Sequence, residues 1–313
     1  MTARFVTRFA PSPTGALHLG NARTLAVTWW WARAEGAEIV LRIEDLDHPR
    51  KKPGAITGLR EDLAWLGLDY DRETPLQSTR SGRHESVLRE LLDRGLAYPC
   101  VCTRKDVEEA ASAPHETGVE PGYDGRCRGR YATLEAAFGD AGRLPAIRFR
   151  TLPGPEEFVD VLLGPESRDA SREGGDFVIG RADPNLVPRP GSQLAVVVDD
   201  EDDGVTHVFR GADLLSSVAR QRMLQRALGY RTLVYGHVPL VVGKDGRRLA
   251  KRHGDTRLLT LRAKGIAPQA IWDWIAASSG AAPRPPADLV RHGFPATGFP
   301  RSPVIPPDSL SIG

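Results

Sequence analysis

The spacing of apolar and polar residues predicts alternating strands and helices in the first part of the chain. Apolar runs at Phe5–Phe9 and Glu38–Ile43 are typical of buried strands, and apolar residues recur at helical spacing in Gly20–Glu35, between them. Strand, tight loop, helix and second strand are the order of an open α/β sheet. Glu44 follows the second strand, at the end where such sheets bind ligands.

The same pattern continues along the chain. It predicts helices at Gly54–Leu66, Ser81–Arg94, Ser216–Leu228 and Pro268–Ser278, and strands at Ala97–Cys102, Ala146–Arg150, Glu157–Leu162, Phe177–Arg181, Val205–Arg210 and Leu233–Val238. The apolar run Leu194–Val198 begins the second half of the sheet domain. Residues 128–190 are rich in turns, which indicates an insertion between the two halves.

These changes divide the chain into five expected parts. We expect the first half of a catalytic domain at 1–97, an inserted subdomain at 98–191, the second half at 192–241, a basic loop with a helical segment at 242–280 and a proline-rich tail at 281–313. The tail contains eight prolines and little periodicity, so it is expected to be irregular or partly disordered.

The loop from Arg8 to Gly20 has the composition of a phosphate-binding turn. Pro11, Pro13 and Gly15 break regular structure directly before a helix, whose N-terminus presents backbone N–H groups. Gly20 has no side chain to block a nucleotide, and His18 adds a donor that is available at neutral pH. Taken alone, a His-containing turn before a helix is more often structural than functional.

Three cysteines lie close together in the sequence, at Cys100, Cys102 and Cys127. An odd number of thiols argues against a disulfide framework and leaves metal binding open. Structural zinc takes four ligands, so a fourth is needed, and the candidates are Tyr123, His115 and Asp124. The alternative is three unliganded thiols in a reducing compartment.

Composition restricts the partners and the compartment. The 313 residues include 42 Lys and Arg against 40 Asp and Glu, so net charge does not indicate a nucleic-acid-binding protein. RNA contacts would have to come from local clusters such as Val241–Lys264, with eight basic residues against two aspartates. No apolar run reaches the length of a membrane span and the N-terminus lacks a signal-peptide pattern, so we expect a soluble cytoplasmic protein.

Four sequence blocks resemble class I aminoacyl-tRNA synthetases, and most closely their glutamate-specific branch. They are Ala10-Pro11-Ser12-Pro13-Thr14-Gly15 leading into His18-Leu19-Gly20-Asn21, Arg42-Ile43-Glu44-Asp45-Leu46-Asp47, Val208-Phe209-Arg210-Gly211-Ala212-Asp213-Leu214, and Leu249-Ala250-Lys251-Arg252-His253-Gly254. The blocks keep the family's order, and the resemblance covers residues 4–278. It implies a Rossmann-like catalytic domain with an inserted zinc-binding and acceptor-binding subdomain and a short helical C-terminal segment.

The resemblance also implies roles for individual residues. It implies catalytic roles for His18, Gly20 and Lys251, ATP binding by His18, Gly20, Asn21 and Lys251, and glutamate binding by Arg8, Phe9, Ala10, Pro11, Ser12, Glu44, Ser192 and Arg210. Arg8 and Arg210 would meet the two carboxylates of glutamate, and Glu44 its ammonium group. A Cys-x-Cys…Tyr-x-x-x-Cys pattern in one branch of the family favours Tyr123 as the fourth zinc ligand, with Cys100, Cys102 and Cys127.

One position departs from the family. Ser192 stands where the family usually has a tyrosine, although Gln193 keeps an amide at the next position. Loss of an aromatic wall is expected to loosen the amino-acid pocket, which affects glutamate affinity or even the identity of the amino acid.

The resemblance implies activation of glutamate by ATP with Mg²⁺, followed by transfer to RNA. Only 59 residues follow Gly254, too few for the helical anticodon-reading domains of a glutamyl-tRNA synthetase. The expected acceptor is therefore queuosine in the anticodon loop of tRNA(Asp), the substrate of a shortened branch. We expect a monomer without an obligate protein partner. A truncated enzyme that charges a tRNA 3′ end and a non-catalytic RNA- or nucleotide-binding paralogue remain alternatives.

Overall fold

The computed structural model describes residues 4–13, 15–46, 54–111, 120–247, 249 and 255–310. Its helices and strands in chain order are β1 (Val6–Phe9), α1 (Leu19–Glu35), β2 (Glu38–Leu41), α2 (Ala55–Leu66), β3 (Arg72–Glu73), α3 (Ser81–Asp93), β4 (Ala97–Cys100), α4 (Arg104–Ala111), β5 (Glu120–Tyr123), α5 (Leu134–Ala141), β6 (Ala146–Phe149), β7 (Glu156–Asp160), β8 (Gly164–Arg168), β9 (Glu173–Gly175), β10 (Val178–Ala182), β11 (Pro188–Pro190), α6 (Ser192–Asp202), β12 (His207–Gly211), α7 (Ser217–Leu228), β13 (Val234–Val238), α8 (Leu258–Ala263), α9 (Pro268–Ser278) and α10 (Pro286–Arg291). Among these helices none is long and apolar enough to cross a membrane.

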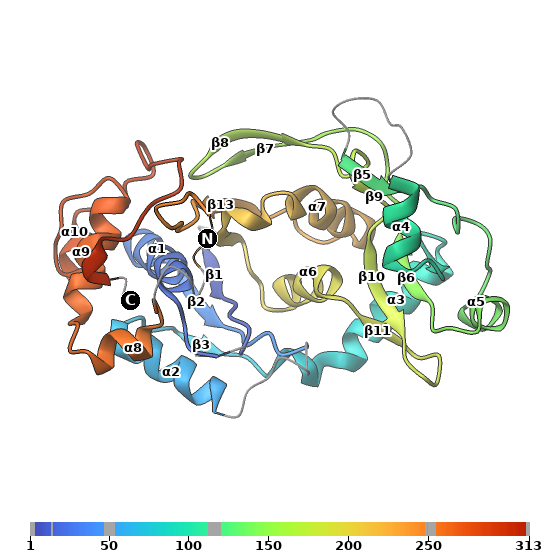
Figure 1. Cartoon of the computed structure of the whole chain (residues 1–313), viewed down its shortest axis with the longest axis horizontal. Coiled ribbons are helices and arrows are strands. Elements are labelled where there is room, and N and C mark those ends of the chain that lie inside the picture. The colour runs from blue at the N-terminus through green and yellow to red at the C-terminus, as the bar shows by residue number, and fades with distance from the viewer. Residues whose placement is uncertain are drawn as a thin grey trace.

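A parallel sheet forms the centre of the molecule (Figure 1). β1, β2 and β3 pair in parallel, as do β12 and β13. The two groups meet where the N–H of Thr206 donates to the carbonyl of Val6 (2.9 Å). β7 adds to the far side of β13 in parallel, and β8 pairs antiparallel with β7. Residues 156–168, within the expected insertion, therefore extend the main sheet.

The predicted elements of the first hundred residues are confirmed to within a few residues. The strands expected at Phe5–Phe9 and Glu38–Ile43 are β1 and β2, and the helix expected at Gly20–Glu35 is α1. The apolar run Leu194–Val198, expected to begin the second half of the sheet domain, lies in helix α6. Its buried face packs in a second core with α3, α7 and the antiparallel sheet β4–β6–β10–β11.

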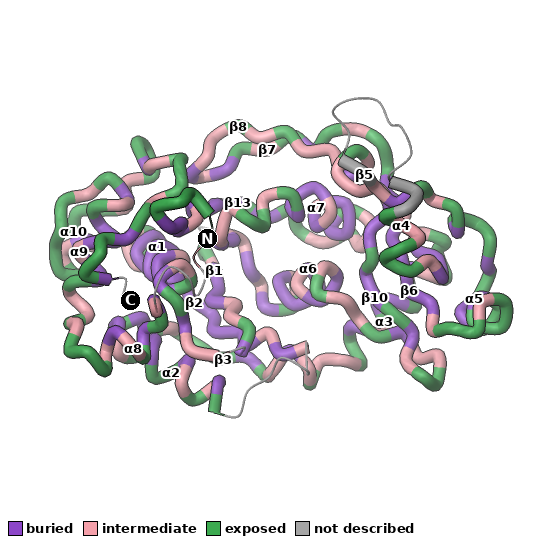
Figure 2. Tube along the Cα trace, in the orientation of Figure 1, coloured by how far each residue is buried: buried purple, intermediate pink, exposed green. Residues whose placement is uncertain are grey.

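Helix α1 contributes many residues to the largest core, and Figure 2 shows most of this helix as buried. Trp30 has almost no exposed surface, and its indole N–H donates to the carbonyl of Leu289 in α10 (3.0 Å). The C-terminal helices therefore cover the side of α1 that faces away from the sheet.

The proline-rich tail is irregular over most of its length, as expected, but it is packed rather than disordered up to residue 310. Phe299 and Leu310 are buried in the core around α1. The N–H of Val304 donates to the carbonyl of Leu240 (2.9 Å), so the tail pairs with the segment that follows β13.

Candidate active site

The loop before α1 is held from two sides. The backbone N–H of Leu17 donates to the Asp62 carboxylate on α2 (3.1 Å). The backbone N–H of Leu19 donates to the carbonyl of Thr256 (3.0 Å), and His18 forms a backbone bridge with the same segment. The chain directly after the expected basic loop is therefore fixed against the His18 turn, although the sequence separates them by more than 230 residues.

The first turn of α1 places three of the predicted ATP-binding residues together. His18 precedes the helix in extended conformation, and its ring is exposed. Partial desolvation lowers the pKa of His18 and Asp255 opposes this effect, so the ring is mainly neutral at pH 7. Asn21 is exposed one turn further on. A Cβ at Gly20 would meet only ordinary contacts 3.8 Å away, on Val241, so packing within the protein does not require a glycine here.

Arg8, on β1, is buried and only partly available to a ligand. Its Nε donates to Asp200 (3.2 Å), and its Nη1 donates to the carbonyl of Phe209 (3.1 Å). Nη2 makes no hydrogen bond within the described part of the chain. Asp200 therefore already offsets part of the charge of Arg8. The sequence predicted that Arg8 would meet a carboxylate of glutamate, but it did not predict this partner within the protein.

The other predicted residues of this loop lie beside the end of β2. The N–H of Glu44 donates to the carbonyl of Pro11 (3.0 Å). Phe9 is buried, Ala10 and Pro11 are partly exposed, and Ser12 is exposed. The loop backbone at Pro11 therefore lies beside Glu44.

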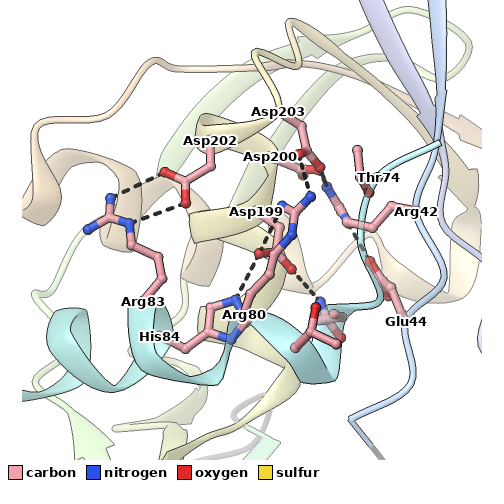
Figure 3. A network of polar contacts seen from close by, with 12 residues as sticks. Arg42, Glu44, Thr74, Arg80, Arg83, His84, Asp199, Asp200, Asp202 and Asp203 are labelled. Atoms are coloured by element: carbon pink, nitrogen blue, oxygen red, sulfur yellow. Dashed lines mark hydrogen bonds and ion pairs between the residues drawn. The ribbon is translucent and has the colours of Figure 1, made fainter. Parts of the chain in front are cut away.

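Arg42 connects Glu44 to helix α6, as Figure 3 shows. Its Nη2 contacts Glu44 (3.1 Å) and Asp200 (2.7 Å), and its Nη1 contacts Asp203 (3.0 Å). Burial raises the pKa of Glu44, while Arg42 and Arg8 lower it. The carboxylate predicted to meet a substrate ammonium is thus fixed by a neighbouring arginine and still partly exposed.

A second set of contacts continues this network toward α3. Asp199 is fully buried, and it accepts hydrogen bonds from His84 (2.8 Å), Gln77 (2.8 Å) and Arg80 (3.3 Å). Sequence reasoning missed this network. The available signal was the acidic run 199–203, which follows the apolar run of α6 without a break and therefore cannot all face solvent.

Arg210 is a buried cation without a nearby carboxylate. Its Nε donates to His237 Nε2 (3.0 Å), its Nη1 to Gln221 (2.7 Å) and its Nη2 to the carbonyl of Leu214 (3.1 Å). In the described ranges no acidic oxygen lies within 4 Å of it. Burial lowers the pKa of Arg210 to about 10, so it stays charged at pH 7. Two of its five N–H donors, one on each Nη, have no acceptor among the residues that the structure describes.

Ser192 and Gln193 begin helix α6. Ser192 is exposed, and Gln193 donates to Ser217 (3.0 Å). Gln221 donates to the amide oxygen of Gln193 (3.2 Å), which links the position next to Ser192 to Arg210 through one side chain. Lys251 lies outside the described residues, as do Thr14, Asp47 and His115.

The three cysteines come together with Tyr123. The sulfur atoms of Cys100, Cys102 and Cys127 all lie within 4.8 Å of one another. The Tyr123 hydroxyl lies 3.4 Å from Cys100 Sγ and 3.9 Å from Cys102 Sγ. Asp124, the other described candidate for a fourth ligand, is paired with Arg126 (2.8 Å). Of the described candidates, Tyr123 alone contacts the thiols.

The comparison with protein families decides the family. The description "tRNA synthetases class I (E and Q), catalytic domain" applies to a model that matches residues 4–284. The chain belongs to this family. It is therefore an enzyme of the class I aminoacyl-tRNA synthetase type, in agreement with the four sequence blocks.

Several curated proteins are similar to this chain. The "Glutamyl-Q tRNA(Asp) synthetase" of Rhodopirellula baltica is 45% identical over 301 residues, covering 92% of this chain and 89% of that protein. The protein of the same name from Symbiobacterium thermophilum is 43% identical, with 97% of each chain covered. "Glutamate--tRNA ligase 1" of Acidithiobacillus ferrooxidans is 42% identical, covering 86% of this chain and 56% of that protein.

A solved structure agrees with the fold. The glutamate-tRNA synthetase of Elizabethkingia anophelis superimposes with a TM-score of 0.78 at 23% identity, over 98% of this chain and 69% of that one. This similarity confirms a class I synthetase catalytic fold of mixed α/β content.

Proposed function

We propose that this enzyme activates glutamate with ATP and transfers the glutamyl group to queuosine in tRNA(Asp). The observation that carries the amino-acid part is Arg210, a buried cation whose hydrogen-bond partners in the described ranges are all uncharged and include no carboxylate. A buried charge without a counter-ion is costly, so the site favours an anionic ligand. Its two free Nη donors suit a carboxylate fork.

Residues on β1 and just after β2 would complete the glutamate site, which Arg210 begins on β12. Glu44 would meet the ammonium group, and Arg8 would contact a carboxylate through its free Nη2. The backbone strip from Phe9 to Ser12 would line the pocket between them. At Ser192 the pocket would be open, since no aromatic ring stands there.

The activation step needs positioning rather than a protein nucleophile. A carboxylate oxygen of glutamate attacks the α-phosphorus of ATP, and the bond to the bridging oxygen breaks, which gives glutamyl-adenylate and pyrophosphate. His18, Gly20 and Asn21 would bind the triphosphate at the first turn of α1, and Lys251 would offset the charge that develops. Mg²⁺ would enter with ATP as its counter-ion.

The acceptor is inferred from the relatives. Two proteins named glutamyl-Q tRNA(Asp) synthetase match this chain over 92% and 97% of its length at 45% and 43% identity. In the transfer step, a hydroxyl on the cyclopentene ring of queuosine would attack the activated carbonyl and release AMP. Glutamate–tRNA ligases are nearly as similar, so the tRNA 3′ end is the competing acceptor.

A transfer experiment with three RNAs distinguishes these acceptors. Labelled glutamate should pass to queuosine-modified tRNA(Asp), and this transfer should survive removal of the 3′-terminal adenosine. Unmodified tRNA(Asp) and tRNA(Glu) should stay unlabelled. Added salt should weaken transfer because it screens phosphate contacts. Labelling of tRNA(Glu), or equal labelling of both forms of tRNA(Asp), would assign the enzyme to 3′-end charging or to another acceptor.

We further propose that Cys100, Cys102, Tyr123 and Cys127 hold a structural zinc ion. Four zinc ligands in a tetrahedron place sulfur atoms about 3.8 Å apart for Zn–S bonds of about 2.3 Å, and the Sγ atoms of Cys102 and Cys127 are 3.5 Å apart here. Arg148 donates to Cys100 Sγ (3.2 Å), so a positively charged side chain contacts the cluster.

Protein purified without added zinc should contain one zinc ion per chain, and a chelator should lower its melting temperature. Tyr123→Phe should weaken zinc retention because it removes one of the four ligands. Tyr131→Phe is the matched control, since Tyr131 lies in the same small core but its hydroxyl bonds to Asp140. Substoichiometric zinc together with unchanged melting after chelation would mean that these are unliganded thiols.

A further inference from the structure

Three neighbouring strands carry a chain of side chains that ends at Arg210. Arg210 on β12 stands directly opposite His237 on β13, and Asp160 lies at the end of β7, the next strand. The His237 and Asp160 side chains have no exposed surface. Neither residue belongs to the site predicted from the sequence, and neither reaches the substrate in the arrangement proposed above.

The hydrogen-bond partners fix the proton of His237. Arg210 Nε can only donate, so His237 Nε2, 3.0 Å away, must be the acceptor. The ring proton is then on Nδ1 and is donated to Asp160 Oδ2 (2.6 Å). Burial lowers the pKa of His237, although the bond to Asp160 opposes this, which agrees with a neutral ring.

This arrangement separates a buried carboxylate from a buried guanidinium by one imidazole ring. Asp160 also accepts hydrogen bonds from the backbone N–H groups of His237 (3.0 Å), Leu162 (2.9 Å) and Leu163 (2.9 Å), so it is held independently of the ring. His237 thereby orients Arg210 through its Nε without bringing a negative charge into contact with it. Each Nη group keeps one donor that no described residue accepts, and no described carboxylate contacts either group.

We propose that His237, fixed by Asp160, is a positioning residue that presents the Nη edge of Arg210 to the substrate carboxylate. The proposal rests on the glutamate site proposed above. It predicts that the acceptor at Nε2 controls glutamate affinity, whereas the contact with Asp160 serves mainly to fix the ring.

Two substitutions separate these contacts. In His237→Asn the amide nitrogen replaces Nδ1 and keeps the donor to Asp160, but no acceptor reaches Arg210. In His237→Gln the longer amide places an oxygen near the position of Nε2 and loses the donor to Asp160. If His237 positions Arg210, His237→Gln should bind glutamate more tightly than His237→Asn. If His237 is purely structural, His237→Asn should be the more stable and more active of the two variants.

Glutamate-dependent exchange between ATP and pyrophosphate measures the difference. His237→Asn should raise the KM for glutamate roughly tenfold or more, the scale of one hydrogen bond to a charged group. The KM for ATP and the melting temperature should stay close to those of the wild type. In His237→Gln the KM for glutamate should return to within about threefold of wild type.

A double-mutant cycle tests whether His237 acts through Arg210. In an Arg210→Lys background, which lacks the Nε donor, His237→Asn should change the KM for glutamate by less than about twofold. An unchanged KM for glutamate in both single variants, with normal wild-type exchange, would overturn the positioning role alone. Absence of glutamate-dependent exchange in the wild type would instead reject the proposed function.

Discussion

Arg42→Met should lower the free energy of unfolding by about 3–5 kcal/mol, because it leaves buried carboxylates without their shared cation. The Arg42 side chain has no exposed surface, and it contacts Asp200 and Asp203, whose side chains are 6% and 4% exposed. Methionine has similar length but donates no hydrogen bond. A loss of this size is a large part of the stability of a typical domain.

The variant should still fold, so the loss can be measured. Arg8 keeps its contact with Asp200, and Arg80 keeps its contact with Asp203. The expected result is a lower urea midpoint at pH 7 with a cooperative transition. Exchange activity should fall as well, because Glu44 loses the arginine that fixes it.

Arg60→Met is the matched control. Arg60 pairs with Glu73 at 2.6 Å, a distance as short as those in the Arg42 network, but about half of the Arg60 side chain is exposed. Solvent screening makes such a pair worth less than about 1 kcal/mol. If the two variants lose the same stability, the buried network contributes no more than a surface ion pair.

The sequence predicts the elements around the His18 loop because their signals are local. Apolar residues at helical spacing define α1, and short apolar runs define the buried strands β1 and β2, so each element can be located from its own residues. The expected place of Glu44 beside a ligand follows only from its position just after β2, because open α/β sheets bind ligands at the carboxyl ends of their strands. The cysteine cluster was also predictable, since its spacing within 28 residues is a local pattern.

The electrostatic partners could not be predicted in this way. Arg8 meets Asp200 across 192 positions, and His237 meets Asp160 across 77. The residues that surround Arg8 and His237 in the sequence do not indicate these pairs, because the pairs depend on the order of strands in the sheet. Consequently the sequence predicted Arg8 only as a ligand of the substrate carboxylate, whereas Asp200 already offsets part of its charge.

The tail shows the same limit for packing. Prolines remove the periodicity on which the prediction of elements depends, so residues 281–313 were expected to be irregular or partly disordered. Phe299 and Leu310 nevertheless lie in the main core, with 4% and 2% exposure. Single buried apolar residues in an irregular segment do not form a repeating pattern of apolar positions, so the sequence does not reveal their burial.

Lys251→Ala should reduce the maximal rate of glutamate-dependent pyrophosphate exchange by on the order of a hundredfold or more, the scale for one transition-state charge contact. The resemblance of its sequence block implies that Lys251 takes the place of the second lysine of the family's mobile basic loop. The chain just after that loop pairs with the His18 turn through Leu19 and Thr256. A backbone hydrogen bond therefore connects the His18 block to the segment that follows the Lys251 block.

The control for charge is Lys244→Ala. Lys244 lies earlier in the same basic segment, is mostly exposed and pairs with Asp308 (2.8 Å), so its removal should change exchange by less than about twofold. The KM for glutamate should be similar in both variants, because an interaction made only in the transition state lowers the rate and not ground-state binding. Equal losses of exchange rate in the two variants would indicate general electrostatic attraction of ATP by the basic segment. An unchanged exchange rate in Lys251→Ala would show that Lys251 does not take part in the activation step.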